Sequence, residues 1–247
     1  MSAFVRPEAG RPFVYGHRGT RRAAPENTLR AMRWALTRGA DGIELDVRLC
    51  GSGEVVVVHD PDLQRVAGAR LSVAELGLSQ LRRYDVGEGE RVPLLEEAMQ
   101  LVLGARKLLN IELKADVPDP AALVAGVVSC LVARSDAERE LCVLSSFSSA
   151  LCSALVRALP EQAVGLLFER GPLELPVGIT AVHPHQSLAL PSLAGYRAAS
   201  LAVNVWTVND PERALELARA GVDGIITDDV PAVLDVLEAL TGESRES

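Results

Sequence analysis

The sequence lacks any hydrophobic run long enough to cross a membrane, although 48% of its 247 residues are hydrophobic. The longest apolar run, residues 121–133, is interrupted by a glycine and a serine and falls short of the ~18 residues that a bilayer span needs. Arg6, Glu8 and Arg11 lie where a signal peptide would have its apolar core. We therefore expect no transmembrane segment and a cytoplasmic protein.

Cysteine and basic charge are also scarce. The four cysteines show no paired or metal-type spacing, which is typical of reduced, mostly buried thiols in a cytoplasmic protein. The 33 acidic residues outnumber the 25 basic ones and give a net charge of −8, which argues against a nucleic-acid partner and against a basic membrane-binding surface. The cysteines are Cys50, Cys130, Cys142 and Cys152.

The chain alternates short β-rich apolar runs with amphipathic helical stretches from end to end. Eight strands, each followed by a helical or looped return, are the pattern of an α/β fold of the (β/α)8 barrel type, and residues 12–240 have the length of one such domain. Asp119 before Pro120 and Asp210 before Pro211 are signals for helix starts. The expected strands are Phe13–Tyr15, Gly42–Leu49, Leu108–Leu113, Leu141–Ser145, Ala163–Phe168, Ile179–Val182, Leu201–Val208 and Gly224–Thr227, and the expected helices are Thr28–Arg38, Leu94–Leu103, Pro120–Arg134, Ser148–Leu159 and Pro211–Ala220.

One further β-rich run, Glu54–His59, breaks the alternation. Only four residues separate it from the preceding strand, which is too few for a parallel crossover, so the two runs are expected to form a hairpin. A turn centred on Gly51–Ser52 would place His59 opposite Glu44. The polar stretch that follows, residues 61–92, is expected to be an irregular insertion that forms a small cap over the barrel mouth.

Charged residues within the apolar strands point to a site at the barrel mouth, where the carboxyl ends of the strands meet. Glu44 and Asp46 alternate on one strand and Glu112 and Lys114 on another, so the members of each pair share a face. Three converging carboxylates repel one another and lose their ionisation unless a cation compensates them. All-oxygen ligation favours Mg²⁺ or Ca²⁺, and Mn²⁺ would also suit it. The alternative is a set of structural ion pairs with arginine or lysine.

His17 and His59 are expected near this acidic cluster, where an imidazole suits general acid or base catalysis because it titrates near neutral pH. Arg18 and Lys114 would supply fixed positive charge for a phosphate. They would alternatively form internal salt bridges with the same carboxylates. The other two histidines, at the end of the sixth expected strand, are interpreted as packed residues rather than as substrate ligands.

Short motifs follow one another in order along the chain: HRG at 17–19, PENT at 25–28, GADGIELDV at 39–47, VVHD at 57–60, VPLLEE at 92–97, IELK at 111–114, SF at 146–147, VWTVN at 205–209 and GVDGIITD at 221–228. Together they resemble the glycerophosphodiester phosphodiesterase family over residues 13 to about 230. The resemblance implies a TIM barrel with a small insertion after the second strand. It also implies an enzyme that carries out metal-assisted hydrolysis of a small-molecule glycerophosphodiester to sn-glycerol 3-phosphate and an alcohol.

The resemblance further implies one divalent metal, two catalytic histidines and two cationic phosphate contacts. One histidine would deprotonate the attacking oxygen, which belongs to water or to the neighbouring glycerol hydroxyl, and the other would protonate the leaving alcohol. Two aromatic residues would wall the glycerol or alcohol side unless they only pack the barrel. The matching residues are Glu44, Asp46 and Glu112 for the metal, His17 as base and His59 as acid, Arg18 and Lys114 for the phosphate, and Phe147 and Trp206 for the wall.

The sequence departs from the family pattern in two places. The turn after the second strand reads LCGSG at 49–53 where the family has Thr-x-Asp-Gly, and Pro231 follows Asp228 one residue later than usual. The alternatives are a related barrel phospholipase of the phosphoinositide-specific C or sphingomyelinase D type, activity on lysophospholipids, and a barrel that binds glycerophosphodiesters without hydrolysing them. The oligomeric state has no signature in the sequence.

Overall fold

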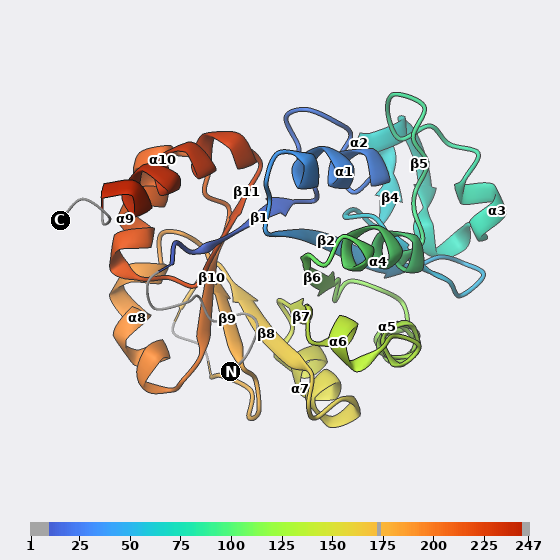
Figure 1. Ribbon diagram of the computed structural model, residues 1–247. Coiled ribbons are helices and arrows are strands. Elements are labelled where there is room, and N and C mark those ends of the chain that lie inside the picture. Colours follow the sequence, from blue (N-terminus) through green and yellow to red (C-terminus); the bar gives the residue numbers. More distant parts are fainter. Residues whose placement is uncertain (1–9, 172–173, 244–247) are drawn as a thin grey trace.

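The computed structural model describes residues 10–171 and 174–243. Eight parallel strands follow one another in chain order around a barrel, and β1 closes it by pairing with both β11 and β2 (Figure 1). The (β/α)8 barrel predicted from the sequence is therefore confirmed. The barrel strands are β1 (Phe13–His17), β2 (Gly42–Leu49), β6 (Leu108–Leu113), β7 (Cys142–Ser146), β8 (Ala163–Phe168), β9 (Ala181–Pro184), β10 (Ala202–Val205) and β11 (Gly224–Thr227).

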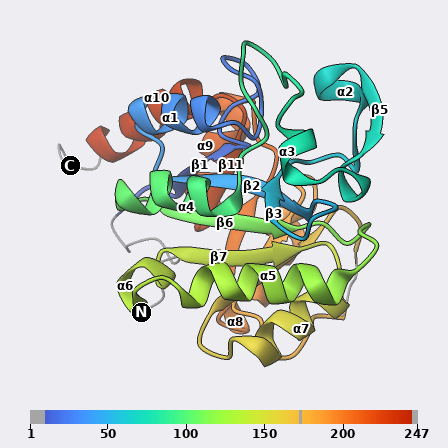
Figure 2. The same cartoon turned by 90° about the vertical axis from the view of Figure 1, so that its right-hand side faces the viewer.

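Helices surround this barrel on the outside (Figures 1 and 2). Four of them begin within one residue of the predicted start, because the side chains of Thr28, Asp119, Ser148 and Asp210 each accept a hydrogen bond from a backbone N–H of the first turn. The sequence pattern does not predict α8, which has no side-chain cap, or α10. The helices are α1 (Leu29–Thr37), α4 (Leu95–Gly104), α5 (Pro120–Val132), α6 (Asp136–Arg139), α7 (Ser149–Ala158), α8 (Ala189–Ala198), α9 (Pro211–Ala220) and α10 (Val230–Glu243).

The strand β2 contributes to both the core and the site. Ile43, Leu45 and Val47 are fully buried in the hydrophobic cluster between the barrel and its helices. Glu44 and Asp46 alternate with them, so their carboxylates point to the opposite face, the barrel interior. Packing of the apolar side chains therefore fixes the position of the two charged ones.

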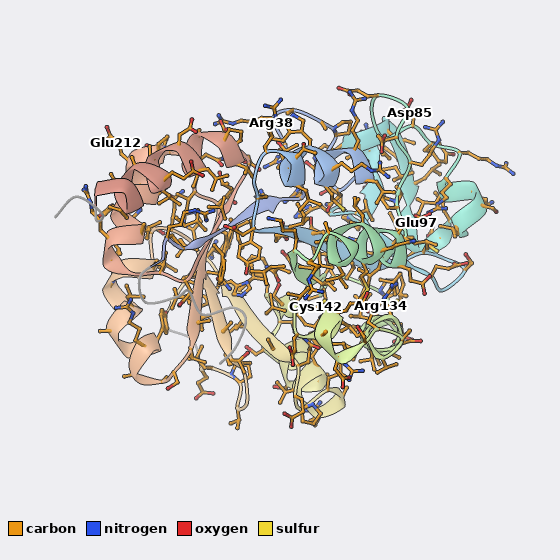
Figure 3. The ribbon with its side chains drawn as sticks, viewed as in Figure 1. Arg38, Asp85, Glu97, Arg134, Cys142 and Glu212 are labelled. Carbon is orange, nitrogen blue, oxygen red and sulfur yellow. The ribbon has the colours of Figure 1, made fainter. Side chains whose placement is uncertain are left out.

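Several charged side chains lie on the outer surface. The side chains of Arg38 at the end of α1, Asp85 before α4 and Glu212 on α9 are exposed at the periphery (Figure 3). None of the helices between residues 10 and 243 that the structure describes has the length and apolar character needed to cross a bilayer.

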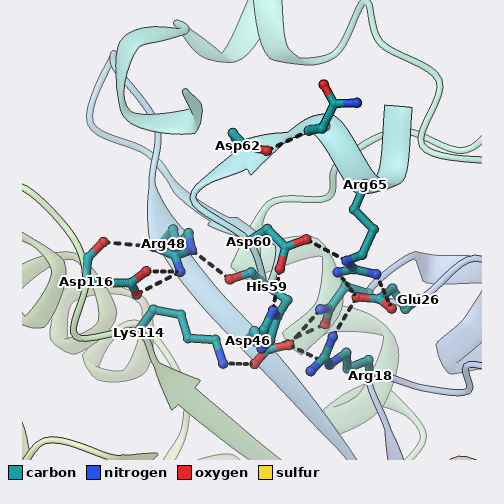
Figure 4. Close-up of polar contacts among 12 residues, drawn as sticks. Arg18, Glu26, Asp46, Arg48, His59, Asp60, Asp62, Arg65, Lys114 and Asp116 are labelled. Carbon is teal, nitrogen blue, oxygen red and sulfur yellow. Dashed lines mark hydrogen bonds and ion pairs between the residues drawn. The ribbon is translucent and has the colours of Figure 1, made fainter. Parts of the chain in front are cut away.

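The hairpin predicted after β2 is present, but its predicted register is wrong. The strand β3 (Val55–Val57) runs antiparallel to β2, with Val57 opposite Val47. Because the Cys50 N–H bonds to the carbonyl of Glu54, the turn is centred one half-residue later than expected. An extended β3 would therefore place His59 opposite residue 45 and turn it away from the site. Instead β3 ends at Val57, and the chain bends so that His59 reaches the acidic cluster (Figure 4).

Residues 61–92, the predicted cap, are not irregular as expected. The two strands β4 and β5 pair with each other, and apolar side chains of the cap pack against Val56 and Val58 of the hairpin to form a second hydrophobic cluster. Figure 2 shows the cap beside the end of the barrel at which β2 and β3 meet. Its elements are β4 (Asp62–Leu63), α2 (Gln64–Ala67), β5 (Ala69–Ser72), the 3-10 turn η1 (Val73–Glu75) and α3 (Leu78–Leu81).

Candidate active site

The three predicted carboxylates converge at the mouth of the barrel. Glu44 and Asp46 stand on β2 and Glu112 stands on β6, and the strand register places Asp46 beside Glu112. Each residue offers one oxygen atom, and these oxygens lie within 4.8 Å of one another. All three residues are buried. Such a group of oxygen donors fits a hard divalent cation.

Two cations compensate part of this negative charge. Lys114 Nζ lies 2.6 Å from Asp46 Oδ1 and 2.5 Å from Glu112 Oε1. Arg18 Nε lies 3.2 Å from Asp46 Oδ2 on the other side, as Figure 4 shows. The structure thus contains the internal salt bridges that the sequence predicts as one of two roles for Arg18 and Lys114. Arg18 Nε makes no hydrogen bond, so this buried donor can still serve an anion.

The cluster is electrostatically uneven. Burial, and then the charges of Asp46 and Glu112, raise the pKa of Glu44 well above its ordinary value. Burial and Asp46 likewise raise the pKa of Glu112 to about 7. Burial acts in the same direction on Asp46, but Lys114 and Arg18 outweigh it and hold the pKa of Asp46 below its ordinary value. A divalent cation would relieve the repulsion that the two glutamates retain.

His17 stands at the end of β1, next to Glu44 of β2 in the strand register. Its Nδ1 lies 2.8 Å from Oδ1 of Asp228, which follows β11, and its Nε2 lies 3.9 Å from Oε2 of Glu44. Asn209 Nδ2 donates to the second oxygen of Asp228 at 2.8 Å and fixes that carboxylate. The arrangement leaves Nε2 of His17 free to face the acidic cluster.

His59 lies on the other side of the cluster, in the segment after β3. Its Nδ1 lies 2.7 Å from Oδ1 of Asp60, and Arg48 Nε donates to its backbone carbonyl at 2.8 Å. Burial lowers the pKa of His59, and the charge of Asp46 opposes that shift. Both predicted histidines therefore have a carboxylate at Nδ1, and neither Nε2 makes a hydrogen bond to another residue within the part of the chain that the structure describes. The sequence pattern indicates no role for either carboxylate.

The loop between β1 and α1 contributes two more residues that the sequence analysis names only as part of the PENT motif. Glu26 accepts a hydrogen bond from Arg18 Nη1 at 2.8 Å. Burial opposes ionisation of Glu26, but hydrogen bonds from Arg65 and Arg18 outweigh it and lower the pKa of Glu26 to about 2. Asn27 donates to Asp46 Oδ2 at 2.8 Å, and its backbone lies in the left-handed region with φ of 57°.

An open groove with a volume of about 290 Å³ reaches the cluster. The residues that line it include Glu112 of the acidic cluster, His59 beside that cluster, Asp116 and Phe147. Phe147 is 44% exposed and packs edge to face against Trp206, with 5.3 Å between the ring centroids. Of the two predicted aromatic residues, Phe147 lines the groove and Trp206 supports it.

The two remaining histidines lie outside the cluster. His183 is fully buried between Asn110 and Asn204, 3.4 and 3.1 Å away, and burial lowers its pKa to about 3. This is the packed residue that the sequence analysis describes. The ring of His185 packs edge to face against Trp206, with 5.3 Å between the ring centroids.

Comparisons with known proteins agree with this geometry. A sequence profile of the glycerophosphoryl diester phosphodiesterase family matches residues 17–232. A glycerophosphodiester phosphodiesterase of Caldanaerobacter subterraneus subsp. tengcongensis is 31% identical over 238 residues, which are 91% of this chain and 97% of the relative.

Two solved structures share the whole barrel. A phosphodiesterase of Oleispira antarctica, solved in complex with the product sn-glycerol-3-phosphate, is 28% identical with a TM-score of 0.83, covering 92% of this chain and 97% of that one. A glycerophosphodiester phosphodiesterase of Thermotoga maritima is 28% identical with a TM-score of 0.75, covering 91% of this chain and 98% of that one. The chain therefore belongs to the glycerophosphoryl diester phosphodiesterase family, and it is an enzyme of the phosphoric diester hydrolase class.

Proposed function

We propose that this enzyme hydrolyses small-molecule glycerophosphodiesters to sn-glycerol 3-phosphate and an alcohol. The observation that carries the proposal is the pair of histidines, His17 and His59, on two sides of one acidic cluster, each held at Nδ1 by its own carboxylate. The product bound to the Oleispira antarctica relative supports the glycerol 3-phosphate side of the reaction. The acting unit in this proposal is one domain, residues 12–240, with residues 61–92 as its cap.

We propose further that Glu44, Asp46 and Glu112 hold one Mg²⁺ or Ca²⁺ ion, and Mn²⁺ would suit the same oxygens. When bound, such an ion would supply positive charge for the phosphoryl oxygens of the diester, on which negative charge grows in the transition state. Arg18 and Lys114 lie on either side of Asp46 and would contact the same phosphate.

The two histidines divide the proton transfers in this mechanism. His17 Nε2 takes the proton of the attacking oxygen, which belongs to water or to the adjacent glycerol hydroxyl, while Asp228 stabilises the imidazolium that forms. The new oxygen–phosphorus bond forms as the bond to the alcohol oxygen breaks. His59 Nε2 gives that oxygen a proton, so the alcohol leaves neutral. If the glycerol hydroxyl attacks, water opens the cyclic phosphate in a second step with the roles exchanged: His59 takes a proton from water, and His17 returns its proton to the glycerol oxygen.

The alcohol leaves through the groove beside His59 in this scheme. Phe147 lies in the wall of the groove, and Trp206 packs behind it.

All four cysteines of the chain are unpaired, which supports a reducing compartment such as the cytoplasm.

Release of glycerol 3-phosphate from glycerophosphocholine and glycerophosphoethanolamine tests the proposal. The protein is stripped of metal and then assayed with Mg²⁺, Ca²⁺ or Mn²⁺. We expect release only with a divalent ion. His17→Ala should lower the rate at least about 100-fold, because a general base contributes roughly 10²–10⁴-fold, while His185→Ala, outside the cluster, should keep the rate within a few-fold. Absence of release with every metal would overturn the proposal, and lysophospholipids would then be the next substrates.

A further inference from the structure

A side chain of the cap reaches the site that the barrel forms. Arg65 stands on the four-residue helix α2, and its guanidinium bridges Glu26 of the β1–α1 loop and Asp60 of the segment after β3 (Figure 4). Arg65 Nε lies 2.6 Å from Asp60 Oδ2. Its Nη1 and Nη2 lie 2.8 and 2.7 Å from the two oxygens of Glu26. One planar group thus fixes two carboxylates from two different segments.

Each of these two carboxylates contacts a residue with a part in the proposed reaction. Asp60 Oδ1 lies 2.7 Å from Nδ1 of His59, the proposed acid. Glu26 Oε1 lies 2.8 Å from Nη1 of Arg18, a proposed phosphate contact. Positive and negative groups therefore alternate along one connected chain, from Arg18 through Glu26, Arg65 and Asp60 to His59.

The cap holds Arg65 in place from behind. Its neighbour Leu63 is fully buried in the cap cluster, and Val66 packs against the same cluster together with Val56 and Val58. Val66 also borders the small cavity of about 10 Å³ that Glu26 and His59 line. Packed residues before and after Arg65 in the chain therefore fix the position of its backbone, from which the guanidinium reaches the site.

Stability of the cap alone does not account for this arrangement. The side chain of Arg65 is 45% exposed, and ion pairs that face solvent contribute little to folding. The two carboxylates are more enclosed, with side-chain exposures of 11% for Glu26 and 23% for Asp60. Among the residues that the structure describes, Asp60 would keep His59 as its one charged partner without Arg65, and Glu26 would keep Arg18 and the exposed Arg21.

We propose that Arg65 is a positioning residue, which orients His59 through Asp60 and Arg18 through Glu26 for the reaction proposed above. The inference rests on that proposed function. It assigns the cap a direct part in assembling the site. Two effects should follow from loss of Arg65: slower protonation of the leaving alcohol and weaker binding of the phosphate.

The test compares Arg65→Gln with Arg70→Gln, which changes an exposed arginine on β5 of the same cap. The substrates are glycerophosphoethanolamine, whose alcohol needs a proton to leave, and the 4-nitrophenyl ester of glycerol phosphate, whose phenolate does not. We expect Arg65→Gln to lower kcat about 10–100-fold on the first substrate and less than about threefold on the second, since the effect on kcat comes from general acid catalysis. The inhibition constant of sn-glycerol 3-phosphate should rise several-fold.

A lysine at position 65 provides a second variant, which also serves if the glutamine variant does not fold. Arg65→Lys keeps the charge but has no planar fork, so it should recover only part of the kcat on glycerophosphoethanolamine. A purely structural role predicts a different result: equal losses on both substrates that follow the fall in the unfolding midpoint. Equal losses, or an Arg65→Gln variant that behaves as Arg70→Gln does, would overturn the inference.

Failure of the proposed function would be seen separately, because the unmodified enzyme would then release no glycerol 3-phosphate. Nitrogen NMR of the His59 imidazole decides the positional inference in that case. A signal that shifts in Arg65→Gln and not in Arg70→Gln supports it, and an unchanged signal overturns it.

Discussion

The side chain of Asp228 determines which nitrogen of His17 faces the substrate. Its oxygen lies 2.8 Å from Nδ1, so Nδ1 carries the proton and Nε2 is free to accept one. An amide at position 228 could donate to Nδ1 and would favour the opposite tautomer. We therefore expect Asp228→Asn to lower kcat by about 10²–10⁴-fold, the range of a lost general base, in the glycerol 3-phosphate release assay.

Asp229 provides the matched control. Its carboxylate pairs with Arg22 at the surface, and it accepts a weak hydrogen bond from the Ala232 N–H at the start of α10, which asparagine can also accept. Asp229→Asn should therefore keep kcat within about twofold, since its side chain contacts Arg22 and not His17. A near-normal kcat for Asp228→Asn would contradict the role of His17 as base.

At this residue scale, the sequence pattern predicts the three clustered carboxylates and the two histidines of the proposed site, but not the carboxylates that contact those histidines. Glu44, Asp46 and Glu112 are conspicuous as charges inside apolar strands, and the structure brings them together. Asp60 and Asp228 stand at strand ends, where an acidic residue attracts no notice. Their partners are fixed by the barrel closure and by the bend after β3, neither of which local spacing encodes.

At the scale of elements, the cap has its own hydrophobic cluster, and under the proposed role of Arg65 part of the site would depend on it. Leu81 of α3 is fully buried in the cap cluster, and Leu155 of α7 is fully buried in the barrel cluster. Replacing either leucine by alanine should cost about 2–5 kcal/mol of unfolding free energy. Leu81→Ala should in addition loosen residues 61–92 and so lower kcat more than Leu155→Ala does.

Hydrogen exchange together with the release assay checks this expectation. Faster exchange in Leu81→Ala should be confined to the cap and the hairpin it packs on, whereas Leu155→Ala should affect α7 and its neighbouring strands. Equal kcat values for the two variants at matched stability would show that the cap does not contribute to the site.

The elements themselves follow from the sequence where local signals are strong. Pro211–Ala220 has the bounds of α9 because Asp210 caps it and Gly221 ends it in a left-handed conformation. The register between β2 and β3 does not follow from the sequence, because a small change in the position of the turn changes the partner of every residue in the hairpin. The hydrophobic cluster of the cap is also not predicted by the hydrophobic pattern of the sequence. Its apolar side chains belong to elements of two to four residues, which are too short to show a helical or strand periodicity.

Across the whole molecule, buried titrating groups make stability depend on pH in opposing directions. The pKa of Glu112 is raised to about 7, so the stability it contributes is fully present below its unfolded value of 4.5 and is lost as the pH rises through 7. The pKa of His183 is lowered to about 3, so its contribution is present above 6.5 and is lost as the pH falls toward 3. A single stability curve would therefore hide both effects.

The difference between wild type and Glu112→Gln separates them, because His183 is common to both. Without metal, the unfolding midpoint of the wild type should fall relative to Glu112→Gln between pH 4.5 and 7. The unfolding free energy of the wild type relative to Glu112→Gln should fall by at most about 3 kcal/mol over this range. For a chain of this size, that corresponds to a shift in the midpoint on the order of 5–10 °C.

A divalent ion should shift this difference in favour of the wild type, since only the wild type retains all three carboxylates. An ion at about 100 times its Kd would stabilise the wild type by about 2.7 kcal/mol. Thermal unfolding of both proteins at pH 5 and pH 7.5, in chelator and in Mg²⁺, gives the midpoint difference under each of these four conditions. A midpoint difference that is independent of pH in chelator would contradict the raised pKa of Glu112, and one that is insensitive to metal would remove Glu112 from the proposed ligands.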